Sequence, residues 1–512
     1  MLAIVLAAAA GGVYAFSGAT LAGDESALAR VDLQPFAGSV ARVTASDSQG
    51  RPIPLEVRGG RLTPETPLAP GERVSISVVV RRPGWSSWAL GKTRHVTLSV
   101  RAPVAHVRQR WLTVAPGASV RVGFDTPVSR VSAGGRPVAP DGASVSLHRK
   151  TAAGSVEVAA AARAWERLGP AVKVTWFPSA RQPVVLPHPS PSARISPLEP
   201  LRLTFSKPVA AVLGSSRPAL SPQVPGRWTE EDTHTLVFTP SRLGARFAST
   251  LHARFSRPLA VAGAGANRAT VGREVDWQVA PASFLRLQQL LAEEGYLPLT
   301  WTPSAGPVAH SARAELAAAI DAPDGTFSWR YPNTPVELRQ LWREGEPNTI
   351  TRGAVMMFQD EHGLTVDGIA GKDVWQAALA DAIAGKRRTD GYSYVFVHRE
   401  VPQLLTLWHN GAVVLTSPGN TGVPAAPTAL GTFPVFEHIP VGRMSGTNPD
   451  GSHYDDPGIR WISYFHQGEA LHAFNRNSFG TPQSLGCVEL PLASAAKVWP
   501  YTPIGTLVTI EN

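Results

Sequence analysis

The sequence predicts a multidomain, mainly β protein in which tandem β-sandwiches precede a small helical bundle and a C-terminal β domain. Its 512 residues, 43% hydrophobic and 17% charged, are too many for a single hydrophobic core. Gly and Pro number 46 each, without a collagen-like period, which indicates many turns between short strands. The spacing of apolar residues changes from two to about 3.6 near Ala282 and returns to two after Thr389.

The N-terminal stretch from Met1 to Phe16 is almost wholly apolar and small, and polar sequence begins near Gly23. This pattern predicts an export signal or membrane anchor over residues 1–26. The apolar run is shorter than the roughly 20 residues that a membrane span requires. Several small-residue sites follow it, so cleavage and retention as an anchor both stay open.

Residues 27–281 are predicted to form three β units, over 27–102, 103–187 and 188–281. Val74, Ile76, Val78 and Val80 alternate with polar residues, which places them on one face of a sheet. An internal repeat supports the division, because the segment 120–128 (VRVGFDTPV) is similar to the segment 201–209 (LRLTFSKPV). The units resemble bacterial Ig-like domains. They carry no catalytic constellation, so a spacer and positioning arm is the favoured interpretation.

Residues 282–388 carry helical spacing and helix punctuation. A first helix places Phe284, Leu287, Leu290 and Leu291 on one face and ends at Gly295. A capping box at 334–337 (TPVE) predicts a second helix, with Leu338, Leu341 and Trp342 facing inward. Thr351 is the expected cap of a third helix, and Val374 to Leu379 mark a fourth.

The stretch from Ala354 to Trp375, which includes the loop sequence Asp367-Gly368, resembles the helical peptidoglycan-binding domain, with an extended segment around residues 303–333. The resemblance implies a module that docks on the glycan and peptide of the cell wall. A rigid helical spacer is the alternative, since Asp-Gly makes a good turn in any loop.

Residues 389–512 return to strand periodicity and form the predicted C-terminal β domain. The runs 404–409 and 412–416 flank Asn410-Gly411, a strong signal for a tight hairpin. Cys487 is the one cysteine in the chain, which excludes an internal disulfide framework and a thiolate metal cluster.

The residues around Cys487 favour a reactive thiol. His472 precedes it within the same predicted domain, and Ser484-Leu485-Gly486 leads directly into it. Acyl transfer from an amide requires a thiolate, a base that generates it, and backbone N–H groups directed at the oxyanion. The Gly486 and Cys487 N–H groups are the expected oxyanion donors, and the Ala473 carbonyl is the expected partner that orients the imidazole.

The same residues carry a resemblance to the YkuD-type L,D-transpeptidase catalytic domain, whose motif places a histidine some fifteen residues before Ser/Thr-x-Gly-Cys. His472 and Ser484 to Cys487 fill the motif, and the segments 427–434 (PTALGTFP) and 461–465 (WISYF) agree with it. The resemblance implies two-step acyl transfer on peptidoglycan stem peptides, with release of D-alanine and formation of 3→3 crosslinks. It also implies an extracytoplasmic location and sensitivity to carbapenem-type inhibitors, and no cofactor.

The predicted site therefore has a catalytic group and a substrate-binding group. The catalytic residues are Cys487, His472, Gly486, Ala473 and Ser484, and the substrate-binding residues are Trp461, Tyr464, Phe474, Asn475 and Arg476. Two positions depart from the family pattern, because Leu485 replaces the common His or Lys and Glu489 replaces Arg or Asn. An unpaired Glu489 would raise the pKa of the nearby thiol.

Several alternatives stay open at this point. The acceptor can be a stem amine, water or a protein amine, so L,D-carboxypeptidase and protein-anchoring activities share this site. A wall-binding protein with a retired catalytic domain is the rival from another class. His438, His453 and His466 lack metal-ligand spacing with His472. The net charge of +9 and pI near 9.9 come without a run of five basic residues, so a solvated basic surface is expected and no nucleic-acid partner.

Overall fold

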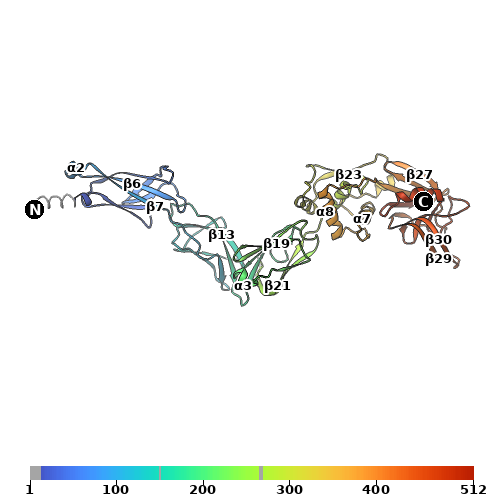
Figure 1. The fold of residues 1–512 in the computed structure, drawn as a ribbon, viewed down its shortest axis with the longest axis horizontal. Helices are drawn as coiled ribbons and strands as arrows, with labels where there is room; N and C mark the ends of the chain where they lie inside the picture. The colour runs from blue at the N-terminus through green and yellow to red at the C-terminus, as the bar shows by residue number, and fades with distance from the viewer. Residues whose placement is uncertain (1–12, 149–150, 264–268) are drawn as a thin grey trace.

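The computed structural model describes residues 13–148, 151–263 and 269–512. Strands predominate over helices, as predicted. The β-rich units follow one another along an elongated molecule, with the N-terminus and the C-terminal domain at opposite ends (Figure 1). Within the described ranges, no helix combines the length and apolarity that crossing a bilayer requires. Residues 1–12 of the predicted export segment lie outside these ranges.

The first β unit consists of two sheets around one core. The predicted inward face is confirmed, because Val74, Ile76, Val78 and Val80 are all fully buried. Its first strand lies within residues 1–26, where only the export segment was expected. One sheet contains β1 (Ala19–Gly23), β2 (Ala29–Leu33), β5 (Arg61–Pro64) and β4 (Leu55–Arg58), and the other contains β3 (Ser39–Ser46), β6 (Arg73–Arg81) and β7 (Thr93–Arg101). The short helix α2 (Gly84–Leu90) connects β6 to β7.

The next two units show why the sequence repeat exists. In both copies the alternate apolar residues point into a core: Val120, Val122 and Phe124 in one, Leu201, Leu203 and Phe205 in the other. Their Ig-like identity stays a prediction. The second unit contains β8 (Trp111–Val114), β9 (Val120–Gly123), β10 (Arg130–Ala133), β11 (Arg136–Val138), β12 (Ser144–Leu147), β13 (Gly154–Ala161) and β14 (Val172–Pro178). The third contains β15 (Val184–His188), β16 (Arg194–Ile195), β17 (Leu201–Phe205), α3 (Val209–Leu213), β18 (Ala219–Ser221), β19 (Gly226–Asp232), β20 (Thr235–Pro240), β21 (Thr250–Val261) and β22 (Thr270–Val279).

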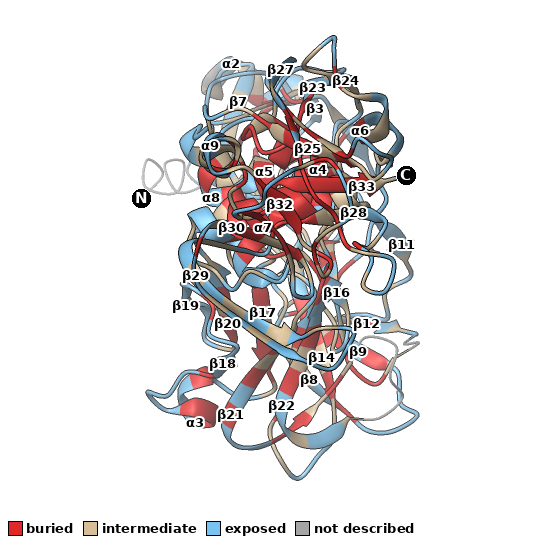
Figure 2. Ribbon diagram, turned by 90° about the vertical axis from the view of Figure 1, so that its right-hand side faces the viewer, coloured by how far each residue is buried: buried red, intermediate tan, exposed pale blue. Residues whose placement is uncertain are grey.

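The helical unit contains the expected helices and a two-stranded sheet that was not expected. The sheet occupies the extended segment, where β23 (Leu299–Pro303) pairs with β24 (Gly325–Trp329). The helices are α4 (Phe284–Glu293), α5 (Ala312–Ile320), α6 (Val336–Gln340), α7 (Thr349–Glu361) and α8 (Lys372–Ala384). Buried residues run through α4 and α7 and continue into strands of the C-terminal domain (Figure 2).

Two predicted helix caps were wrong. Thr334 does not cap α6, because its hydroxyl donates to the Tyr331 carbonyl and the N-cap residue is Pro335. Thr351 lies inside α7, whose cap is Asn348. The Asn348 side chain accepts from the Thr351 N–H at 2.9 Å. Asparagine is as good a cap as threonine, and here it stands directly before the first helical residue.

The C-terminal domain has two sheets. The predicted hairpin is confirmed, with Asn410 at φ +49° and Gly411 at φ +90° between β26 and β27. One sheet has the order β27 (Ala412–Pro418), β26 (Leu404–His409), β25 (Ser393–His398), β33 (Leu507–Glu511) and β28 (Gly431–Pro434). The other has the order β29 (Glu437–Thr447), β30 (His453–His466), β31 (Glu469–Ala473) and β32 (Val488–Leu490). Helix α9 (Leu492–Val498) and the 3₁₀ turn η1 (Trp499–Tyr501) follow β32.

The helical unit and the C-terminal domain share one core. Tyr394, Trp408 and Leu507 of the C-terminal domain are buried with residues of α4, α7 and α8. The backbones approach closely at Gly353 of α7 and Gly505, where a Cβ atom on Gly505 would lie 2.3 Å from the Gly353 carbonyl oxygen. The helical unit and the C-terminal domain are therefore fixed to each other.

Replacing Gly505 by Ala tests this close approach. Gly505 also has φ +87°, so the new Cβ combines backbone strain with a clash, and we expect a loss of about 1–3 kcal/mol in the free energy of unfolding of the C-terminal domain. Thermal or urea unfolding measures it. Gly468→Ala is the matched control, because no atom lies within 4 Å of its Cβ position; equal effects of the two changes would contradict the predicted contact.

Candidate active site

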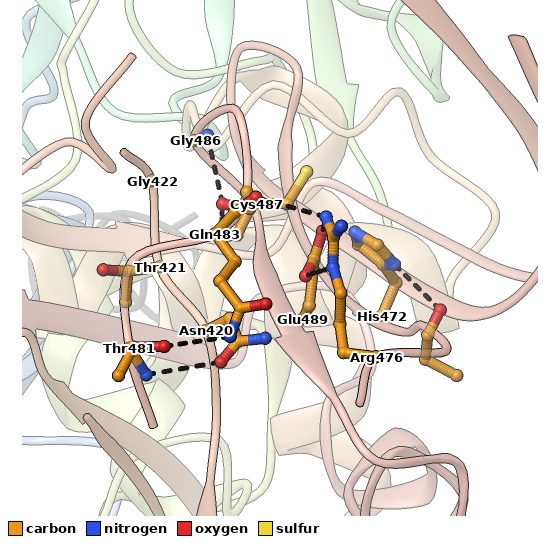
Figure 3. A network of polar contacts seen from close by, with 12 residues as sticks. Asn420, Thr421, Gly422, His472, Arg476, Thr481, Gln483, Gly486, Cys487 and Glu489 are labelled. Atoms are coloured by element: carbon orange, nitrogen blue, oxygen red, sulfur yellow. Dashed lines mark hydrogen bonds and ion pairs between the residues drawn. The ribbon is translucent and has the colours of Figure 1, made fainter. Parts of the chain in front are cut away.

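The pairing of β31 with β32 brings the predicted catalytic residues together. The two strands are parallel, with His472 opposite Glu489 and Leu471 opposite Val488. Paired residues project to the same face of a sheet, and side chains alternate along each strand. His472, Glu489 and Cys487 consequently share one face, and Figure 3 shows the three side chains beside one another.

The turn before Cys487 is held from within by Ser484. The Ser484 hydroxyl donates to the Cys487 carbonyl at 2.6 Å and accepts from the Gly486 N–H at 3.2 Å. Gly486 has φ +110°, a conformation that favours glycine. Because the Gly486 N–H is directed at Ser484, it is engaged in the turn. The Cys487 N–H has no acceptor among the described residues.

His472 is oriented by the backbone of its neighbour. Its Nδ1 lies 3.0 Å from the Ala473 carbonyl oxygen. A carbonyl only accepts hydrogen bonds, so Nδ1 carries the proton and the neutral ring has its lone pair on Nε2. In Figure 3 this second nitrogen lies on the side of the ring that faces Arg476 and Cys487.

Burial keeps both members of the Cys487 and His472 pair neutral at neutral pH. Loss of hydration lowers the pKa of His472 below its ordinary value, although Glu489 opposes this shift. Loss of hydration raises the pKa of the Cys487 thiol to about 12; the Ala470 N–H opposes the rise, while Glu489 and Glu469 add to it. The resting site therefore holds a thiol and a neutral imidazole, and a proton transfer must accompany attack by the sulfur.

Glu489 is paired, contrary to the concern raised by the sequence. Its buried carboxylate accepts two hydrogen bonds from Arg476, at 2.8 Å from Nε and 2.6 Å from Nη2. The guanidinium also lies 4.6 Å from the centre of the Phe474 ring, and Phe474 meets His472 edge-on at 5.9 Å. Arg476 thus connects the carboxylate to the aromatic side chain that packs against the histidine.

Two of the other predicted substrate-binding residues pack against the same small core as Cys487. Tyr464, Phe474 and Cys487 each contact the cluster of Ile459, Ile462 and Ala470, as do Ile439 and Met444. Burial raises the pKa of Tyr464, and a Cys487 thiolate would raise it further. Trp461 instead packs against the core that residues of both sheets form, and Asn475 is exposed.

Three residues outside the predicted set complete the surroundings of the site. Tyr454 of β30 is half-buried; burial raises its pKa, and a charge on Cys487 would raise it further. Glu469 lies against Gly486, with its Cγ 3.2 Å from the Cβ position there, and accepts from the Ala429 N–H. Asn420 is fully buried and accepts from the Gly480 N–H at 3.0 Å. The polar segment Tyr454-Asp455-Asp456 could be expected to frame a cleft, which gave a weak signal, whereas Glu469 and Asn420 had none.

The loop containing Asn420 supports the catalytic turn. The Thr421 carbonyl accepts from the N–H groups of Gln483 and Ser484, at 2.9 and 3.0 Å. Backbone bridges join Asn420 to Glu489 and Gly422 to Ser484. Both flanks of the 484–487 turn are therefore tied to this loop, which lies beside the turn in Figure 3. In the described part of the chain, no group of three His, Cys, Asp or Glu side chains could hold a metal ion.

The charges of Glu489 and Arg476 act on His472 in opposite directions, which gives a paired test. Glu489 raises the pKa of His472 and Arg476 lowers it. Glu489→Gln should lower the pKa of the imidazole further, and Arg476→Gln should raise it. Titration of the His472 ring by NMR measures both shifts. Shifts in the same direction, or the absence of any shift, would contradict this electrostatic explanation. Arg443→Gln is the matched control, because it removes an arginine from an exposed ion pair.

Comparison with known proteins agrees with this site. The family model of the L,D-transpeptidase catalytic domain, YkuD, matches residues 392–510, and that of a putative peptidoglycan-binding domain matches residues 343–378. No curated protein matches the chain.

Solved structures with some likeness include three L,D-transpeptidases, each with a TM-score of 0.22. One from Mycobacterium smegmatis is 13% identical over 64% of this chain and 99% of its own. L,D-transpeptidase 3 from Mycobacterium tuberculosis is 12% identical over 64% and 97%. The catalytic domain from E. faecium is 24% identical over 23% and 96%. At these TM-scores the likenesses carry no argument. It is the matched sequence that places residues 392–510 in the YkuD family of L,D-transpeptidase catalytic domains and residues 343–378 in a peptidoglycan-binding family.

Proposed function

We propose that this protein is a peptidoglycan L,D-transpeptidase whose nucleophile is Cys487 and whose proton carrier is His472. The observation that carries the proposal is the shared face of β31 and β32, which sets a partly exposed thiol beside a buried imidazole of fixed tautomer. The family match of residues 392–510 supplies the reaction class. Peptidoglycan lies outside the cytoplasm, so the chain acts there.

In the first step the Cys487 sulfur attacks the carbonyl carbon that links the third residue of a tetrapeptide stem to its terminal D-alanine. Nε2 of His472 takes the thiol proton as the carbon–sulfur bond forms. The tetrahedral intermediate then expels the D-alanine amine, which receives that proton from the imidazolium. The result is a thioester on Cys487 and free D-alanine.

In the second step a side-chain amine of another stem attacks the thioester carbon. His472 accepts a proton from the incoming nitrogen and returns one to the sulfur as the carbon–sulfur bond breaks. The product is a 3→3 crosslink and the starting thiol. Water in place of the amine makes the same site an L,D-carboxypeptidase, and a protein amine makes it an anchoring enzyme.

The Cys487 N–H is the main-chain donor proposed for the developing oxyanion, because Ser484 engages the Gly486 N–H. A donor that has no partner in the resting protein is available to the transition state without rearrangement. Ser484 is then a positioning residue: it holds the turn that directs the Cys487 N–H.

The substrate side of the site combines a charge with aromatic surface. The Arg476 side chain keeps some exposure beside its contact with Glu489, so it is the proposed contact for a stem carboxylate. Tyr464 and Phe474 line the apolar wall beside the sulfur. Residues 343–378 are the proposed dock on the wall polymer, fixed to the catalytic domain by the shared core.

Carbapenem acylation tests the nucleophile. One L,D-transpeptidase was solved in complex with imipenem, and we propose that this chain forms an adduct with such an inhibitor through Cys487. Intact-mass spectrometry should show one added inhibitor on the unchanged protein and none on Cys487→Ala. His472→Gln should slow the adduct by about 100- to 10,000-fold while leaving its final mass unchanged. An unmodified wild-type chain would favour the retired wall-binding protein.

The pH dependence of acylation separates a neutral pair from an ion pair. Burial lowers the pKa of His472 below 6.5 and raises that of Cys487 to about 12. The rate should therefore rise as His472 loses its proton below pH 6.5 and then stay level through pH 9, because the thiol remains protonated there. A further rise between pH 8 and 9 would indicate a free thiolate, and a fall above pH 6.5 a preformed ion pair.

A further inference from the structure

One end of the first β unit exposes a group of large aromatic side chains, here called the N-terminal aromatic patch. Trp88 is 84% exposed and Trp85 is 57% exposed, both on the short helix α2. Exposed aromatic groups of this size mark surfaces that bind something. The patch consists of Tyr14, Phe16, Phe36, Trp85 and Trp88.

Hydrogen bonds fix the members of the patch at the same end of the unit. Arg94 Nη1 donates to the carbonyls of Tyr14 at 2.7 Å and Ala15 at 3.0 Å, and Arg82 Nε donates to the Ser17 hydroxyl at 3.0 Å. The chain leading to Phe16 is thereby tied to the ends of β6 and β7, next to α2. In Figure 1 this end is farthest from the C-terminal domain.

The most exposed ring of the patch can leave water without leaving its polar group unpaired. The Trp88 indole N–H donates to the Trp85 carbonyl at 2.9 Å. The Trp85 ring meets Phe36 edge-on at 6.1 Å, so the rings form one surface. An indole whose N–H is already satisfied enters an apolar or interfacial medium at lower cost.

The segment that carries α2 is strongly one-sided in charge. Residues 73–124 contain nine Lys and Arg and no Asp or Glu. Arg81 and Lys92 flank α2, are exposed, and form no ion pair within the described residues. Basic side chains around aromatic groups are the composition that anionic lipid headgroups attract.

The sequence that leads into the patch from its N-terminal side carries no charge. No charged side chain occurs from Met1 to Gly23, so apolar sequence leads directly into Tyr14. We propose that the N-terminal aromatic patch docks on the outer face of a membrane with anionic headgroups, with the rings of Trp85 and Trp88 at the interface and Arg81 and Lys92 on the phosphates. The chain is then held by one end, and the β units extend the catalytic domain toward the wall. This inference depends on the extracytoplasmic location and not on the transfer reaction.

The test uses the full chain with two kinds of vesicle, one of phosphatidylcholine alone and one of phosphatidylcholine mixed with the anionic lipid phosphatidylglycerol. Flotation measures the bound fraction, and a lipid-dissolved diazirine with peptide mapping identifies the residues that enter the interface. The wild type should bind anionic vesicles and carry label within residues 84–90. The double variant Trp85→Ser/Trp88→Ser should bind about tenfold or more weakly, and Arg81→Gln/Lys92→Gln should lose the preference for phosphatidylglycerol.

Val271→Ser/Val413→Ser is the control for removal of exposed apolar groups elsewhere, since these residues are 55% and 59% exposed. Far-ultraviolet circular dichroism and thermal unfolding, compared with the wild type, report separately that each variant is folded. Absence of label from residues 84–90 would overturn the proposal even if the protein floats, because another segment would then hold it. Equal binding by the tryptophan variant and the control would also overturn it, as would self-association through the patch without vesicles.

Discussion

The register of the parallel pair β31 and β32 is the constraint on which the site depends. With His472 opposite Glu489, the imidazole, the carboxylate and the sulfur project from one face. A slip of one residue would turn His472 to the other face and place Ala473 or Leu471 beside the thiol. The loop at Asn420 to Gly422 holds this register, because it pairs with both Glu489 and Ser484. Backbone pairing thus determines which side chains lie together in the site.

An ion pair explains how the site accommodates a carboxylate at position 489, where the family pattern has Arg or Asn. A lone carboxylate next to a nucleophilic thiol would oppose thiolate formation. In this protein Glu489 is paired with Arg476 through a bidentate contact, although its charge still adds to the rise in the pKa of Cys487. The same contact places the guanidinium over Phe474, the ring that packs against His472. The departure at Glu489 is therefore accommodated by a cationic partner from the segment that follows β31.

Much of the architecture could be predicted because local signals were strong. Asn410-Gly411 fixes a hairpin by its backbone preference alone, and Val74 to Val80 mark a buried face by strict alternation. The caps of α6 and α7 were misassigned because several residues near each helix start can serve as caps, and tertiary contacts decide between them. The pairing of β23 with β24 was not predicted, because α5 lies between these two strands in the sequence.

The candidate site was likewise predictable from the sequence only in part. Cys487, His472 and the Gly486 turn were visible as a motif, and the carbonyl of Ala473 followed from its position beside the histidine. Glu469 and Asn420 could not be found, because their contacts with Gly486 and Gly480 join segments that are distant in the sequence.

The aromatic residues of β30 show a further limit of the sequence. Trp461 belonged to the same short motif as Tyr464, yet it packs into a core while Tyr464 faces the sulfur. Sequence alone does not say which aromatic side chain faces the site when a strand has an irregular backbone, and Trp461 has φ +57°.

The proposed function requires the partly exposed sulfur beside β32 and the buried ring of β31 to exchange one amide for another. Product analysis tests this most directly, by incubating the full chain with disaccharide-tetrapeptide stems and separating the products by liquid chromatography and mass spectrometry. We expect free D-alanine together with dimers linked between the third residues of two stems, and neither product from Cys487→Ala. Intact tetrapeptide stems after prolonged incubation with the folded wild-type protein would contradict it.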